Sequence, residues 1–126
     1  MSFMFQNFIY LEKIWGIGNF KTNKVRNMQS MFEHCHFLKY LNLSKYDTSD
    51  VTDTSYMFSN CRQLKELNIK NFTTVCETKK MFFNIQQKLR FETDNSELRE
   101  IYYQSPKYSG PEYERMDLFE YLMSFN

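Results

Sequence analysis

A repeat of 26 residues is the feature that most constrains how this chain can fold. Met31 and Met57, Cys35 and Cys61, and Leu41 and Leu67 are each 26 residues apart. A third, shorter copy follows, in which the Met-Phe pair at 81–82 lies 24 residues after the pair at 57–58. A period between about 20 and 50 residues is typical of proteins built from stacked, similar coils. The repeat therefore predicts a stacked architecture.

Each copy contains a short segment in which leucines alternate with polar residues. Leu41 and Leu43 in one copy correspond to Leu67 and Ile69 in the next. Alternating side chains point to opposite faces of a strand, so these apolar residues should point inward. Such short strands need neighbours, and copies stacked about 4.8 Å apart would supply a parallel ladder. We expect an α/β repeat fold, a short leucine-rich-repeat solenoid with a parallel strand ladder, a 24–26 residue period and a helical C-terminal cap.

The segment between the leucines and the Met-Phe pair is rich in Asp, Thr and Ser. These side chains bond to nearby backbone and favour turns, so the stretch DTSDVTDTS at 47–55 should reverse the chain. Thr54 or Ser55 could then cap a helical turn. We expect one helical or 3₁₀ turn there, carrying Met57 and Phe58 inward.

The phrase LNLSKYDTSDVTDTSYMFSNCRQLKELNIKNFTT, residues 41–74, resembles the repeat of the BspA-like leucine-rich repeat surface proteins. The D-T-S-x-V-T turn, the Met-Phe pair and the cysteine occur in the order of that repeat, and the likeness extends over roughly residues 11–89. Thr54 stands where the family repeat usually has its first Met. The resemblance implies a solenoid used for adhesion or partner binding at the cell surface, with no catalytic residues to transfer.

The end of the repeat divides the chain into two expected regions. Residues 1–91 should form the solenoid with an N-terminal cap, in which Trp15 and Ile17 take the positions of Leu41 and Leu43. The N-terminal apolar residues should cover the first coil; they are Phe3, Phe5, Phe8, Ile9 and Leu11.

Residues 92–126 should form an acidic, mostly helical cap or tail, with helices at about 96–104 and 112–124. Residues 91–126 hold 3 basic and 8 acidic residues, a balance of −5, whereas residues 1–90 hold 13 against 7, a balance of +6. We therefore expect the tail to dock on the last coil near Leu89 and Phe91, with apolar contacts from Met116, Phe119, Leu122 and Met123.

His34, Cys35 and His36 form the one sequence pattern that suggests a metal, because zinc prefers imidazole and thiolate ligands. However, Cys35 occupies the same repeat position as Cys61, where a small buried residue fits. We therefore expect packing, with no metal and no cofactor. Cys35 and Cys61 could form a disulfide between coils in an oxidising compartment, and reduced thiols are the preferred interpretation.

The composition gives little support to several functional classes. The net charge of +1 provides no general attraction for nucleic acid, and we expect none to bind. The first residues resemble neither a signal peptide nor a membrane span, so we expect no membrane insertion. That absence points to an intracellular or incomplete chain, whereas the family resemblance points to the surface. Localisation and oligomeric state stay open.

The leading interpretation is a non-enzymatic recognition or adhesion module that binds a protein or glycan through its strand face. One alternative is a truncated or partial repeat segment with only a structural or assembly role, since fewer than three full repeats is marginal for stability. A small nucleic-acid-binding protein is the third possibility. The candidate binding residues point outward from two neighbouring coils; they are Tyr40, Asn42, Ser44, Glu66, Asn68 and Lys70.

Overall fold

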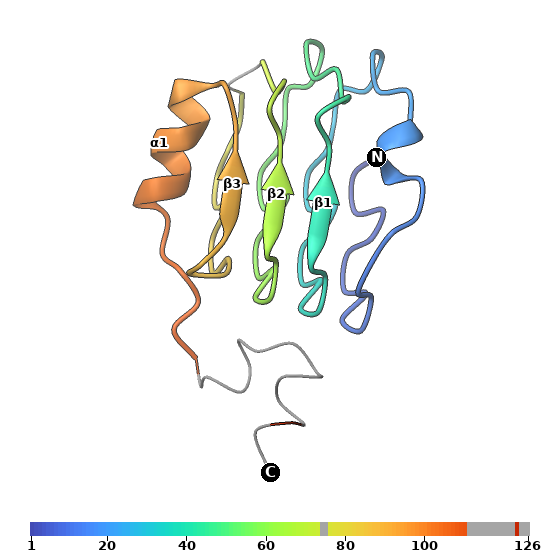
Figure 1. The fold of residues 1–126 in the computed structure, drawn as a ribbon. Coiled ribbons are helices and arrows are strands. Elements are labelled where there is room, and N and C mark those ends of the chain that lie inside the picture. The colour runs from blue at the N-terminus through green and yellow to red at the C-terminus, as the bar shows by residue number, and fades with distance from the viewer. Residues whose placement is uncertain (74–75, 111–122, 124–126) are drawn as a thin grey trace.

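The fold is a small α/β structure with a three-stranded parallel sheet and one α-helix (Figure 1). It is a computed structural model that describes residues 1–73, 76–110 and 123. The strands are β1 (Tyr40–Asn42), β2 (Glu66–Asn68) and β3 (Arg90–Glu92), and the helix is α1 (Ser96–Gln104). A single 3₁₀ turn, η1 (Ile17–Asn19), precedes the sheet. The strands lie in the order β1-β2-β3, with α1 next to β3.

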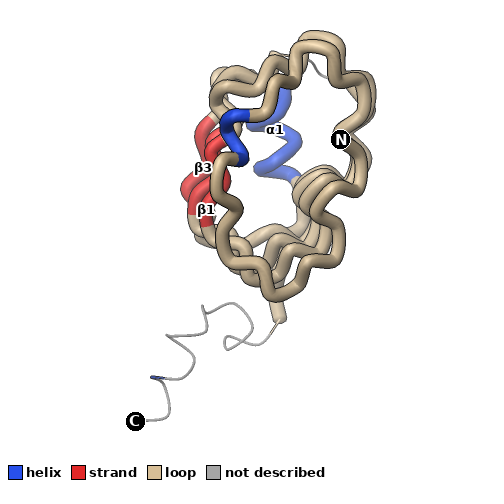
Figure 2. Tube along the Cα trace, turned by 90° about the vertical axis from the view of Figure 1, so that its right-hand side faces the viewer, coloured by secondary structure: helices blue, strands red, loops and turns tan. Residues whose placement is uncertain are grey.

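The register of the strands follows the sequence repeat. Leu41 pairs with Leu67, which pairs in turn with Phe91, in parallel ladders. These pairs are separated by the same 26 and 24 residues as the repeat. Leu41 and Leu67 are only 2% and 1% exposed, so the expected inward alternation is confirmed. Seen along the sheet, successive turns of chain lie one behind another (Figure 2).

The Met-Phe pairs lie in what we call the turn segments, residues 1–7, 28–34, 54–60 and 78–84. The helical turn expected at Met57 and Phe58 is wrong, because each turn segment instead contains two residues with positive φ, such as Tyr56 (58°) and Asn60 (62°). This conformation directs alternate N–H groups along the stack. Phe58 N–H donates to the Met81 carbonyl of the next coil (2.9 Å), whereas Cys61 N–H donates locally to Phe58 (3.2 Å). A helix would have kept all these bonds within one coil.

Thr54 or Ser55 was expected to cap that helical turn, and Thr54 instead bonds to the next coil. Its backbone N–H and its Oγ1 both donate to the Glu77 carbonyl of the next coil, at 2.8 and 3.1 Å. The side chain therefore joins two coils rather than ending a helix.

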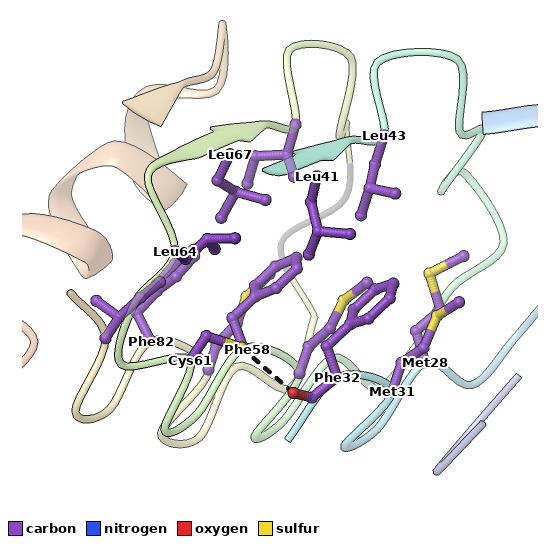
Figure 3. Close-up of a cluster of buried hydrophobic side chains, with 14 of the residues drawn as sticks. Met28, Met31, Phe32, Leu41, Leu43, Phe58, Cys61, Leu64, Leu67 and Phe82 are labelled. Carbon is purple, nitrogen blue, oxygen red and sulfur yellow. Dashed lines mark hydrogen bonds between the residues drawn. The ribbon is translucent and has the colours of Figure 1, made fainter. Parts of the chain in front are cut away.

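A column of stacked phenylalanine rings runs through the core under the sheet (Figure 3). Ring centroids are 5.6 Å apart from Phe5 to Phe32, 5.8 Å from Phe32 to Phe58 and 5.8 Å from Phe58 to Phe82. The planes of neighbouring rings differ by no more than 10°. Leu41 and Leu67 point towards this column from the strands (Figure 3). The coils of β1 and β2 thus each contribute one phenylalanine ring and one strand leucine to a continuous core.

The N-terminal coil covers the core only in part. Phe5 stacks on Phe32 as expected, but Trp15 does not take the inward position of Leu41 and is 83% exposed. Gly16 adopts a left-handed φ of 74°, which a side chain would disfavour, and the chain then enters η1. Ile14 packs against the core instead, whereas Ile17 is buried in the core, as expected from the position of Leu43. The repeat is therefore shifted locally by one residue around Trp15.

Helix α1 covers the other end of the stack. Its predicted bounds are confirmed, although the N-cap is Asn95, whose side chain accepts from the N–H groups of Glu97 and Leu98. Leu98 and Tyr102 are buried, and the Tyr102 ring stacks 4.2 Å from the Phe91 ring. The first predicted C-terminal helix thus covers Phe91. The second, expected at about 112–124, lies outside the described residues except for Met123.

Candidate partner-binding surface

The outward side chains of the three strands form two rows across the sheet. Tyr40, Glu66 and Arg90 are paired in one row. Tyr40 is 46% exposed, and the other two are also exposed. Parallel strands lie about 4.8 Å apart, so a ligand can contact several strands at once. The expectation that Tyr40 and Glu66 come from equivalent positions of neighbouring coils is confirmed.

The second row consists of Asn42, Asn68 and Glu92. Together the two rows line a shallow groove of about 240 Å³, with the backbone of Leu41 and Leu67 between them. Most of the groove's side chains are exposed, and the leucines anchor them to the core. The groove is therefore an open surface on a rigid support rather than an enclosed pocket.

Two of the charged side chains on this surface, Glu66 and Arg90, form an ion pair. The Arg90 Nη1 lies 3.6 Å from the Glu66 Oε1, with both side chains more than half exposed. An exposed pair of this kind contributes at most about 1 kcal/mol to stability. Both groups can thus turn to a partner at little cost in folding free energy.

Asn42 and Asn68 also have a structural role at the ends of their strands. The Asn42 Oδ1 accepts from the Ser44 N–H (3.1 Å), and the Asn68 Oδ1 accepts from the Lys70 N–H (2.9 Å). Such side-chain turns direct the chain out of a strand. The two side-chain carbonyl oxygens are therefore engaged in these turns.

Ser44 and Lys70 do not join the groove, although we expected all six candidates to form one surface. The strand has ended before each of them, because the asparagine turns change the direction of the chain. Ser44 lies in a neighbouring hollow of about 260 Å³ with Trp15. Lys70 lies in another of about 370 Å³ with Asp94. The predicted site is thus divided among three hollows.

Sequence reasoning missed Arg90, Glu92 and Trp15. The first two could have been found by adding 24 to Glu66 and Asn68, which is the offset of the shortened third copy. Trp15 gave no such signal, because the 26-residue offset places it inward. In the structure its ring is open to solvent and lies 4.1 Å from the Lys13 Nζ.

The thiols at 35 and 61 lie in the core, as packing groups would. The Cys35 Sγ donates to the Phe5 carbonyl (3.1 Å), and the Cys61 Sγ donates to the Phe32 carbonyl (3.3 Å). Burial raises the pKa of Cys35 to about 12 and that of Cys61 well above its usual value. Zinc ligation and nucleophilic attack both require thiolate, which these surroundings disfavour. All three cysteines are free.

His36 is held in its neutral form. Burial lowers its pKa to about 4, helped by the positive charges of Arg62 and His34. The rings of His34 and His36 lie edge to face at 5.7 Å. Across residues 1–73, 76–110 and 123, no group of three or more His, Cys, Asp or Glu side chains is placed to hold a metal ion.

Membrane insertion was also not expected. Within the part of the chain that the structure describes, no helix is both long and apolar enough to span a bilayer.

Comparison with known proteins identifies a family without naming a function. No curated protein and no solved structure matches the chain. A family model described as "Mycoplasma protein of unknown function, DUF285" matches residues 1–97. The match includes all three strands and the first residues of α1, and therefore both rows of outward side chains. Since it covers well over half of the 126 residues, the chain belongs to this family.

Proposed function

We propose that this chain is a leucine-rich-repeat solenoid of the BspA-like type, and that it acts as a non-enzymatic recognition module. Its partner is a protein or a glycan, and its binding surface is the strand face. The observation that carries the proposal is the register of the sheet, which aligns Tyr40, Glu66 and Arg90 in one exposed row above a buried leucine ladder.

The chemistry of this row suits recognition of a polar partner. Tyrosine and arginine are enriched among the residues that dominate binding energies, because each combines a flat contact surface with hydrogen-bond donors. Glu66 adds acceptors, and the amide nitrogens of Asn42 and Asn68 add donors beside them. Leu41 and Leu67 fix the backbone under the row, so little conformational entropy is lost when a partner binds.

The test is binding of the purified chain to arrays of immobilised glycans and purified proteins. Any ligand found is then measured against Tyr40→Ala and Arg90→Ala, each of which should weaken binding by at least about tenfold, the effect of one lost anchor. Tyr103→Ala is the matched control, because Tyr103 is 68% exposed on α1, away from the strand face. Ligands whose binding is unchanged by both strand-face variants would contradict the proposal.

A further inference from the structure

The hydrogen bonds between successive turn segments all run in one direction. Phe3 N–H donates to Gln29, Ser30 N–H donates to Ser55, and Tyr56 N–H donates to Lys79, each at 2.9 Å. Within the turn segments, every described backbone–backbone bond from one coil to another runs from an N–H nearer the N-terminus to a carbonyl nearer the C-terminus. Each turn segment therefore presents carbonyls on one side and N–H groups on the other.

This polarity leaves a row of carbonyls at the N-terminal end. In the second turn segment, three carbonyls accept from the N–H groups of the first; they belong to Gln29, Met31 and Glu33. The equivalent positions in the first turn segment, 27 residues earlier, are Ser2, Met4 and Gln6. Among the described residues, no hydrogen bond reaches the carbonyls of Ser2, Met4 and Gln6. An open row of backbone groups is a template for pairing with another polypeptide, as at the edge of a sheet.

Apolar side chains accompany this row. Phe5 has a parallel ring on one face only, that of Phe32, whereas Phe32 and Phe58 have parallel rings on both faces. Phe3, Met4 and Phe8 are 48%, 44% and 54% exposed. Exposed apolar groups that cluster in this way mark interaction sites. The end of the stack thus offers the same two features by which each coil binds the one before it.

The direction of the bonds limits what can occupy this end. A second copy joined N-terminus to N-terminus would bring two rows of acceptors together, and no hydrogen bond could form between them. A second copy joined by its C-terminal end offers only the Lys80 and Phe82 N–H groups, because the Asn84 N–H already donates to the Pro106 carbonyl (2.9 Å). In addition, α1 covers the last ring, since the Tyr102 ring meets Phe82 edge to face at 5.6 Å. The occupant must be a chain with a free row of N–H groups.

We propose that the N-terminal coil docks a further coil of the same kind, contributed by another polypeptide chain. The turn segment of that chain donates alternate N–H groups to the carbonyls of Ser2, Met4 and Gln6. An aromatic side chain of the partner stacks on Phe5 and extends the column of rings. This surface lies beyond β1, at the opposite end of the sheet from α1 (Figure 1).

The probe is a synthetic peptide with the sequence of residues 53–61, carrying Ser in place of Cys61. It includes the turn segment 54–60, whose N–H groups point to the next coil in the intact chain. Titrated into the ¹⁵N-labelled whole chain, the peptide should cause saturable NMR shifts in residues 2–10. A peptide with an N-methyl group on the Phe58 amide should lose binding, because by equivalence this N–H donates to Met4.

Variants of the whole chain separate docking from unspecific contact. Phe8→Glu introduces a charge at the docking end and should weaken peptide binding at least tenfold. Phe3→Asn is a second variant that keeps the coil intact, because Asn tolerates the φ of 60° at this position. Tyr103→Glu places the same charge on α1 and should have no effect.

Three results would overturn the proposal. The first is shifts confined to the strand face, or no saturable shifts at all. The second is equal binding of the N-methylated peptide, which would show that the carbonyl row is not used. The third is self-association of the whole chain in sedimentation experiments that Phe8→Glu abolishes, which would make a second copy the occupant.

Discussion

Replacing Phe58 by alanine tests whether the stacked rings hold the coils together. The ring is fully buried and lies between Phe32 and Phe82, with both centroids 5.8 Å away and interplanar angles of 4° and 10°. Truncating a buried phenylalanine costs about 3–5 kcal/mol, because transfer energy is lost and a cavity remains. A domain of this size has a total stability of about 5–15 kcal/mol. Phe58→Ala should therefore remove a large part of it.

Phe58→Leu separates the ring contacts from simple burial. Leucine keeps an apolar side chain in the site but removes both aromatic contacts, each worth about 0.5–1.5 kcal/mol beyond the area buried. The expected loss is about 1–3 kcal/mol, smaller than that of Phe58→Ala.

Equilibrium urea denaturation followed by circular dichroism measures both losses. The matched control is Phe83→Ala, next to the column in sequence but only half-buried, with its ring 5.1 Å from the Lys80 Nζ. Losing that contact should cost about 1 kcal/mol or less. If Phe58→Ala cost no more than Phe83→Ala, the stacked column would not be part of the folded core.

Three further measurements test other parts of the fold. Leu67→Ala should cost about 2–5 kcal/mol in urea denaturation, and a loss below about 0.5 kcal/mol would refute the strand register. Cys76 should react with a thiol reagent in the folded chain, whereas Cys35 and Cys61 should react only on unfolding; equal rates would contradict their burial. His36 has a folded pKa of about 4 against 6.5 when unfolded, so the unfolded state binds more protons between these values. Stability should be fully present above pH 6.5 and fall by on the order of 1–3 kcal/mol towards pH 4, and a glutamine in its place should flatten this dependence.

The sheet could be predicted from the sequence because the repeat itself encodes the register. When equivalent residues recur at a fixed spacing, Leu41 and Leu67 must occupy equivalent places, and only one pairing of the strands allows this. Helix α1 could be predicted for a different, local reason, since its start and its apolar side chains lie within a few residues of each other.

The backbone of the turn segments could not be predicted in the same way. Asn7, Asn60 and Asn84 share one of the two positive-φ positions, and asparagine tolerates that conformation better than most residues, so a signal was present. Tyr56 and Lys80 at the other position carry no such signal. Their conformation is imposed by the hydrogen bonds to the next coil, which become visible only when the coils are stacked.

In the candidate site, too, the sequence predicts the direction of some side chains and not of others. Alternation along the strand predicts that Tyr40 and Glu66 point outward, and they do. The same rule fails for Ser44, because the Asn42 side chain ends the strand first. It also fails for Trp15, because a left-handed Gly16 shifts the chain by one residue. Both failures arise from single backbone turns that the repeat spacing does not encode.

The two proposed surfaces lie on different parts of the molecule, so substitutions can test them separately. The strand face runs across β1, β2 and β3, so its partner would contact several coils side by side. The N-terminal end lies beyond β1 and would be met along the stack (Figure 1). Because Tyr40 and Arg90 are outward-pointing and Phe5 is in the core column, substitutions on the strand face should leave end docking unchanged. A partner on either surface would therefore leave the other accessible, and one chain could join a repeat assembly while its strand face binds a ligand.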